Sequence, residues 1–182
     1  MKTFSFLHYL RNKIKLQKGN TIIIGKNVGI SGCTIIIKGQ NNCLTIGDLS
    51  RLRNMTIEIV GNGCKIEIGE RCVIGHGSYL SAKEENTHLL IGNNCMFSRN
   101  VNILTSDGHP IYQNNRRINP AQHIMIGHHV WLADNVTVLK GVTIGEGSVI
   151  GIHSLVTKSI SHYAIAVGNP AREVKEEIHW EI

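Results

Sequence analysis

The chain has little aromatic content and very little proline. Phe, Tyr and Trp make up 5% of its 182 residues, and only three prolines occur. A core with few large rings must be filled by Ile, Val and Leu, and a disordered Pro-rich linker is disfavoured. The length suits one domain. The 19 glycines indicate many tight turns, because glycine adopts backbone conformations that other residues avoid.

Long apolar runs and paired cysteines are also missing. No stretch approaches the roughly 20 apolar residues that a membrane helix needs, and the Phe4-to-Leu7 run is too short for a signal peptide. The five cysteines are odd in number and form no CxxC pair, which disfavours a disulfide framework or a structural zinc site. Cys72 and Cys95 each stand four places after the Ile of an Ile-Gly pair, where small residues recur. We interpret them as small core residues, and reduced thiols fit a cytoplasmic location.

Positive charge is in excess, with 19 Lys and Arg against 13 Asp and Glu and a formal net charge of +6. This excess fits an anionic partner such as nucleic acid, a membrane surface, a phosphorylated cofactor or an acidic glycan, and equally fits solubility alone. The basic residues are scattered and lack an aromatic stacking pattern. The sequence therefore disfavours a nucleic-acid-binding protein.

A six-residue repeat dominates the second half of the chain. Its aliphatic positions are Ile126, Leu132, Val138, Ile144, Ile150 and Val156. In the first half the period is 22, because residues 21–25 are echoed by 43–47 and 65–69. Six residues make one flat β side and a turn, three sides close an 18-residue coil, and a 22-residue step adds a four-residue bulge at a corner. Each coil stacks at about 4.8 Å on the next, and neighbouring coils bury one another's apolar face. The repeat predicts an all-β parallel β-helix over residues 19–168.

Both ends and one internal segment fall outside the repeat. Residues 1–18 carry spaced apolar and basic side chains, which predicts a short amphipathic helix that caps the first coil or, alternatively, contacts a membrane. Residues 169–182 form the C-terminal tail, for which we expect a helix over Ala171 to Ile178 that packs along the coils. The register also breaks at a loop, residues 104–123, where function is often located. His109 in this loop is a candidate general base, because imidazole exchanges protons near neutral pH.

These motifs carry a family resemblance. Ser-Asp-Gly-His-Pro-Ile at 106–111, the Trp131 segment, and Gly-Asn-Pro-Ala at 168–171 followed by Arg172 resemble the hexapeptide-repeat sugar O-acetyltransferases. Among these, the enzymes that acetylate capsular polysaccharide or polysialic acid are the most similar. The resemblance implies a left-handed parallel β-helix and acetyl-CoA as co-substrate. It also implies a homotrimer with the donor in a groove between adjacent subunits, no metal, and a location in the cytoplasm or at the inner face of the membrane.

The resemblance also implies roles for single residues. His109 matches the general base, and Trp131 matches a residue that positions the donor thioester. The implied donor contacts are Trp131, Ala133, Asp134, Gly151, Ile152, Thr157, Lys158 and Arg172. Asp134 and His153 depart from the pattern, because relatives often carry serine and a small residue there. A backbone N–H near Gly151, or the Trp131 indole, is the expected oxyanion donor.

Three further residues are candidates from their own chemistry. Asp107 is close enough in sequence to orient the His109 imidazole, or it shapes the turn. Arg116 and Arg117 follow the histidine and match the geometry of a carboxylate-bearing sugar. The alternative for this pair is a solvated loop tip whose arginines pair with nearby acids.

Two other functions stay open from the sequence. One is a γ-type carbonic anhydrase-like metalloenzyme, because His88, His123 and His128 are spaced somewhat like its zinc ligands. That reading leaves His109, Trp131 and the C-terminal turn unexplained. The other is a non-catalytic β-helix that binds glycan or organises an assembly.

Overall fold

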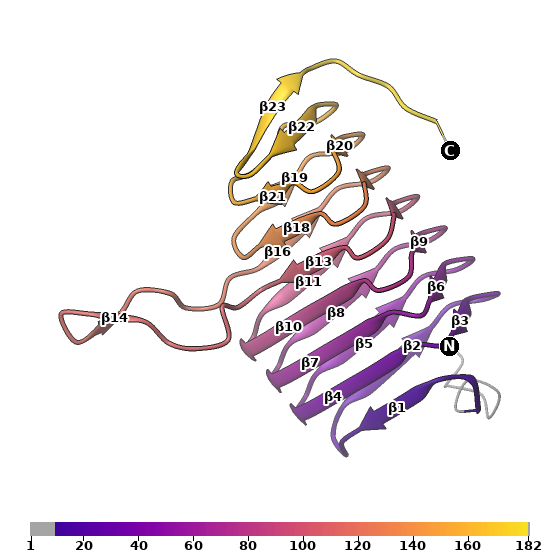
Figure 1. Cartoon of the computed structure of the whole chain (residues 1–182). Helices are drawn as coiled ribbons and strands as arrows, with labels where there is room; N and C mark the ends of the chain where they lie inside the picture. Colours follow the sequence, from indigo (N-terminus) through magenta and orange to yellow (C-terminus); the bar gives the residue numbers. More distant parts are fainter. Residues whose placement is uncertain (1–9, 182) are drawn as a thin grey trace.

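Three mainly parallel sheets form the three sides of a coil that winds through the described part of the chain (Figure 1). The computed structural model describes residues 10–181. The seven-stranded side contains β1 (Lys13–Leu16), β4 (Thr34–Gln40), β7 (Thr56–Asn62), β10 (Tyr79–Glu85), β13 (Asn102–Leu104), β18 (Thr137–Leu139) and β21 (Leu155–Val156). The six-stranded side contains β2 (Thr21–Ile24), β5 (Cys43–Ile46), β8 (Lys65–Ile68), β11 (His88–Ile91), β16 (Ile124–Ile126) and β19 (Thr143–Ile144).

The eight-stranded side completes each turn. It contains β3 (Gly29–Ser31), β6 (Arg51–Arg53), β9 (Val73–Ile74), β12 (Met96–Phe97), β17 (Trp131–Leu132), β20 (Val149–Ile150), β22 (Ile165–Gly168) and β23 (Ala171–Lys175). Among the strands of residues 10–181, two pairs are antiparallel, namely β22 with β23 and the small hairpin of β14 (Tyr112–Gln113) and β15 (Arg116–Arg117). The all-β parallel coil predicted from the repeat is confirmed. Within residues 10–181, no helix has the length and apolar character to cross a membrane.

The core consists of columns of aliphatic side chains, one from each coil. On the seven-stranded side the register stacks Ile35, Ile57, Leu80, Ile103, Val138 and Val156, all fully buried. Side chains alternate between core and solvent along each strand, so every second residue points inward and fills the coil. Cys72 and Cys95 are free thiols buried in this core, which confirms their role as small core residues.

The four extra residues of the 22-residue coils lengthen one strand in each coil. β4, β7 and β10 are seven residues long, whereas β18 and β21 in the 18-residue coils have three and two. Gly39 and Gly61 occupy equivalent places near the ends of β4 and β7 with φ of +102° and +146°. A Cβ on either glycine would collide with the backbone of the next coil. Glycine therefore allows the long strands to stack directly on one another.

The helical predictions for the ends are wrong over most of the residues that the structure describes, since a helix is present only at Leu10 and Arg11 of the two described segments. The predicted N-terminal helix covers residues 1–18, of which residues 1–9 lie outside the described part. Lys13–Leu16 is instead strand β1, which adds to β4 and stacks Ile14 on Ile35. The segment Ala171–Lys175 is strand β23 and pairs with β22. In both places an open sheet edge offers unpaired backbone groups, and pairing with that edge outweighs helical propensity.

Candidate active site

The segment with the broken register leaves the coil as a protruding loop. It joins β13 on the seven-stranded side to β16 on the six-stranded side and carries the β14–β15 hairpin (Figure 1). The segment between these two strands runs from residue 105 to residue 123, and the loop was predicted at 104–123.

One carboxylate ties the two ends of this loop to the coil. Glu84, near the end of β10, accepts hydrogen bonds from Ser106 Oγ at 2.6 Å and from the Ala121 backbone N–H at 3.4 Å. It also forms an ion pair with Arg117 Nη2 at 2.8 Å. The hydrogen bond from Arg117 is the largest of the effects that lower the pKa of Glu84. The loop is therefore anchored to the coil through an ionised Glu84 at neutral pH.

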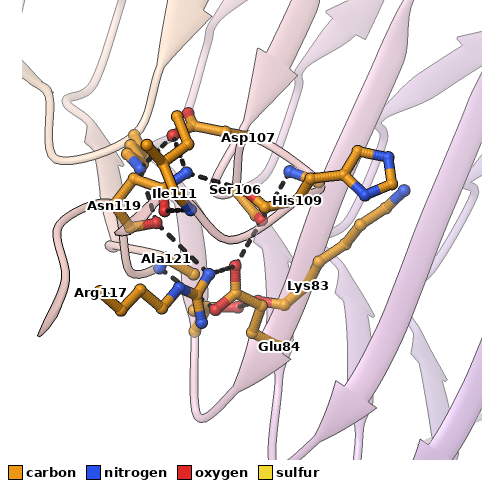
Figure 2. Close-up of polar contacts among 12 residues, drawn as sticks. Lys83, Glu84, Ser106, Asp107, His109, Ile111, Arg117, Asn119 and Ala121 are labelled. Atoms are coloured by element: carbon orange, nitrogen blue, oxygen red, sulfur yellow. Dashed lines mark hydrogen bonds and ion pairs between the residues drawn. The ribbon is translucent and has the colours of Figure 1, made fainter. Parts of the chain in front are cut away.

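A second cluster fixes the backbone around His109. The buried Asn119 donates from Nδ2 to the His109 carbonyl and to Asp107 Oδ2, both at 2.9 Å, and accepts from the Ile111 N–H at 2.5 Å. Lys140, which follows β18, donates to Asp107 Oδ2 at 2.5 Å and to the Asn119 carbonyl at 3.0 Å. The hydrogen bond from Lys140 is the main reason that the pKa of Asp107 is lowered. The chain on both sides of His109 is thus held by hydrogen bonds (Figure 2).

The His109 side chain itself is exposed and projects away from this anchoring cluster (Figure 2). The carboxylate of Asp107, expected to orient the imidazole, contacts Lys140 and Asn119 in this structure. Asp107 thus shapes the loop backbone. Gly108 between the two has φ of +86° and open space around it, so the chain turns there without obstruction.

Trp131 lies on a different side of the coil. It stands in β17 on the eight-stranded side, where Leu132 points into the core and Trp131 points outward and is half-buried. Its indole Nε1 donates to Ser98 Oγ at 3.2 Å. The structure therefore does not bring His109 and Trp131 together within one chain, because the His109 loop joins the other two sides.

The remaining candidate donor contacts follow Trp131 toward the C-terminal coils. Ala133 and Asp134 form the corner after β17, and the carboxylate of Asp134 accepts from the Arg99 backbone N–H at 2.8 Å and pairs with the Arg99 guanidinium. This partner lowers the pKa of Asp134. His153, on the next coil, donates its backbone N–H to the Asp134 carbonyl at 3.0 Å. The residues that depart from the family pattern thus support adjacent corners of the coil.

The expected oxyanion donors are already engaged. The Gly151 N–H donates to the Ala166 carbonyl at 2.9 Å, and the Trp131 indole donates to Ser98. Further along, Ile152 is exposed at the next corner, as are the neighbours Thr157 and Lys158 after β21. Arg172 in β23 is exposed and donates to the Ala171 carbonyl at 2.8 Å. Lys158 and Arg172 thus present positive charge on the last coils.

The two loop arginines do not share one role. Arg117 is half-buried and its Nη2 belongs to the Glu84 anchor, which is the pairing with a nearby acid considered as an alternative. Its Nε is buried with no hydrogen-bond partner. Arg116 lies beside it in β15 and is exposed. Only Arg116 of this pair presents its charge outward.

Three residues that hold the candidate site were not predicted from the sequence, namely Glu84, Asn119 and Lys140. A signal existed for Glu84, because it occupies the place of Gly39 and Gly61 in the stacked coils and keeps their positive φ, at +77°. A charged residue in a column of glycines indicates a special function. Asn119 and Lys140 had no such signal, because their contacts join segments that are distant in the chain.

The histidines that suggested a metalloenzyme have structural contacts. His123 Nδ1 accepts the His88 backbone N–H at 2.9 Å, and the two rings lie 4.9 Å apart. His128 Nδ1 accepts the Asn93 backbone N–H at 2.9 Å. Among the residues that the structure describes, no three His, Cys, Asp or Glu side chains gather in an arrangement that suits a metal ion.

Comparison with known proteins finds two curated relatives that share one name. No family model matches the chain. A polysialic acid O-acetyltransferase of Escherichia coli O1:K1 is 37% identical over 124 residues, which is 67% of this chain and 40% of the relative. A second enzyme of that name, from Neisseria meningitidis, is 37% identical over 115 residues, 62% of this chain and 52% of the relative. The matching region thus spans about half or less of each curated relative.

Among solved structures, the polySia-specific acetyltransferase NeuO is 32% identical with a TM-score of 0.79, and the match covers 94% of this chain and 83% of NeuO. The similarity therefore extends over nearly all of this chain. The chain belongs to the hexapeptide-repeat acetyltransferase family, with the polysialic acid O-acetyltransferases among its relatives.

Proposed function

We propose that the protein is an O-acetyltransferase that moves an acetyl group from acetyl-CoA to a sugar hydroxyl of a bacterial surface polysaccharide. The observation that carries the proposal is His109, whose backbone is fixed by Asn119 while its imidazole stays exposed. The names of the two curated relatives support a sugar polymer as acceptor. The coil is proposed to be left-handed, as in the family.

The chemistry needs one base and no covalent enzyme intermediate. A neutral His109 nitrogen takes the proton of the sugar hydroxyl while its oxygen attacks the thioester carbonyl. The tetrahedral intermediate collapses, the C–S bond breaks, and the proton on the imidazolium passes to the leaving CoA sulfur. Because the acetyl group goes directly to the sugar, neither a serine nor a cysteine nucleophile is required.

The proposed active unit is a homotrimer. His109 lies on a loop between two sides of the coil, whereas Trp131 faces outward from the third side. A loop that protrudes from one chain toward the eight-stranded side of its neighbour would place both residues on one substrate. This division of the site is the structural argument for association.

Donor binding is assigned to the eight-stranded side and its following corner. The proposed path of the pantetheine is lined by four residues, Trp131, Ala133, Gly151 and Ile152. The last coils beyond it carry Thr157, Lys158 and Arg172. The exposed Lys158 and Arg172 suit the CoA phosphates, because ammonium and guanidinium groups form charge-assisted hydrogen bonds with phosphate. Asp134 supports this path indirectly, because Arg99 already holds its carboxylate.

For the acceptor we propose an acidic sugar that is recognised by Arg116, since Arg117 is committed to Glu84. The proposed location is the cytoplasm, where acetyl-CoA is available, with contact of residues 1–18 with the inner membrane face as an additional proposal. Acidic and neutral glycans offered in parallel to the purified enzyme will test the acceptor assignment.

The central test is His109→Ala. Loss of a general base lowers kcat by about 10²–10⁴-fold, and an exposed loop side chain adds little to folding. We expect that loss in a CoA-release assay with purified polysialic acid, with product mass spectrometry, and an unchanged melting temperature. His179→Ala, another exposed histidine, is the matched control. A His109→Ala enzyme within threefold of wild type would exclude this base, and a fully active monomer in sedimentation would exclude the shared site.

A further inference from the structure

The C-terminal tail after β23 does more than close the last coil. The chain turns back from β23 (Figure 1), and the Ile178 N–H donates to the Tyr163 carbonyl at 2.9 Å. Trp180 is only 9% exposed. An indole is a large side chain with a polar N–H, so its burial requires specific contacts.

His129 supplies those contacts at the corner before β17. The Trp180 indole Nε1 donates to the His129 carbonyl at 3.0 Å, and His129 Nε2 lies 3.0 Å from the Trp180 carbonyl. Since a carbonyl only accepts, His129 carries a proton on Nε2. The two rings stack with centroids 4.1 Å apart and an interplanar angle of 5°. Two hydrogen bonds and a stack therefore fix the tail at this one position.

Trp131 follows His129 by two residues, and its ring lies against the same tail. The centroids of Trp131 and Trp180 are 5.9 Å apart at an interplanar angle of 42°, within the range of favourable aromatic pairs. The Trp131 indole Nε1 also donates a hydrogen bond to Ser98 Oγ. The orientation of Trp131 is thus set by one hydrogen bond and by the Trp180 ring.

Trp180 lies outside the aliphatic core that stabilises the coil. The aliphatic core of stacked coils does not include Trp180, whose partners are the half-buried His129 and Trp131 outside that core. A residue that served only to seal the last coil would pack on that coil, whereas Trp180 reaches back to the coil of β17. The Trp180 ring therefore lies against Trp131, the candidate donor contact.

We propose that Trp180 is a positioning residue, which holds Trp131 in the orientation that receives acetyl-CoA and makes the C-terminal tail one wall of the donor site. This assignment rests on the proposed acetyltransferase function. It concerns the donor only, so the acceptor should bind equally well with or without the Trp180 ring.

The test compares Trp180→Ala with Trp180→Phe. Loss of an aromatic pair changes affinity by roughly three- to tenfold, so Trp180→Ala should raise the KM and the calorimetric Kd for acetyl-CoA by that factor. The acceptor KM should stay unchanged. Trp180→Phe keeps a stacked ring and should restore most of the donor affinity. Glu181→Gln, the highly exposed neighbour on the other side of Trp180, should behave as wild type.

A wild-type measurement avoids dependence on the fold of the variants. The chain has two tryptophans, and both belong to this pair. Saturating acetyl-CoA should therefore change their near-ultraviolet circular dichroism. An unchanged spectrum, or unchanged acetyl-CoA Kd in a folded Trp180→Ala protein, overturns the assignment while wild-type turnover persists. A wild-type protein that neither binds nor uses acetyl-CoA overturns the proposed function as well.

Discussion

The anchoring of the His109 loop can be tested from a residue outside the loop. Lys140 follows β18 and its side chain is 16% exposed, with its ammonium between Asp107 and the carbonyl of Asn119. Lys140→Met keeps the length and apolar stem of the side chain and removes the charge and the donors. Because His109 and the loop sequence stay intact, any loss of activity reports on the position of the base.

The expected cost comes from two lost contacts. A hydrogen bond between charged groups contributes about 1.5–3 kcal/mol, but the Asp107 side chain is 38% exposed, so screening by solvent reduces this to about 1 kcal/mol. The carbonyl of Asn119 loses a donor at a cost of about 1 kcal/mol. A total near 2 kcal/mol shifts the balance between anchored and released loop by roughly thirtyfold. Because Glu84 still anchors the loop ends, we expect kcat/KM to fall by about tenfold.

Steady-state kinetics and hydrogen exchange together distinguish this effect from unfolding. Lys140→Met should speed exchange of amides in residues 106–121 and shift the melting temperature by less than about 3 °C, because the coil does not depend on the loop. Lys140→Arg should retain much of the activity. Lys26→Met, at an exposed corner of an early coil, makes the same charge change and should have no effect. Wild-type kcat/KM in the Lys140→Met enzyme would refute the anchoring argument.

Three further results are expected. Arg117→Ala should lower activity on acidic and neutral glycans alike because it releases Glu84, whereas Arg116→Ala should raise KM only for acidic glycans; equal effects of the two variants in paired kinetics would contradict this division. The pKa values of Asp107 and Glu84 are lowered in the folded protein, so their contribution is complete above the ordinary values near 4 and is lost as pH falls through the lowered values. Amide exchange in the loop, corrected for its intrinsic pH dependence, should therefore rise below about pH 4, and a flat corrected profile between pH 5 and 2 would argue against the anchors. Phe97→Ala removes a side chain that is 1% exposed in a central coil and should cost about 3–5 kcal/mol, seen in calorimetry as a large fall in melting temperature, with a fall below about 3 °C as the contrary result.

The coil was predictable because its stabilising contacts repeat with the sequence. Each aliphatic residue of the six-residue register stacks on its equivalent one coil away, so the period of the sequence predicts which residues stack. The ends were not predictable in this way. Lys13–Leu16 and Ala171–Lys175 become strands because the first and last coils leave an open edge beside them, and a local pattern does not reveal that edge.

The site was predictable only in part for a similar reason. His109 stood out because it interrupts the register within a recognisable motif. The residues that hold it do not, since Glu84 lies 33 residues from Arg117 and Lys140 lies 33 residues from Asp107. Arg117 appeared to be an acceptor contact because its charge is visible in the sequence, whereas its partner becomes visible only when β10 is folded beside the loop.

The two parts of the molecule also differ in what holds them, and this difference has a consequence for mutagenesis. The coil depends on fully buried aliphatic columns, in which one truncated side chain costs several kcal/mol. The His109 loop depends on half-exposed polar contacts of about 1 kcal/mol each, around one buried amide, Asn119. Substitutions in the columns should therefore lower the melting temperature before they alter kinetics, whereas substitutions in the loop anchors should lower kcat/KM at an almost constant melting temperature.

Asn119→Asp tests the boundary between these two classes of substitution. It keeps the acceptor for Ile111 but replaces the donor to His109 with a carboxylate next to Asp107, so it should behave as a loop variant although the side chain is buried. A melting temperature that falls as far as in Phe97→Ala would place Asn119 in the structural core and remove this distinction.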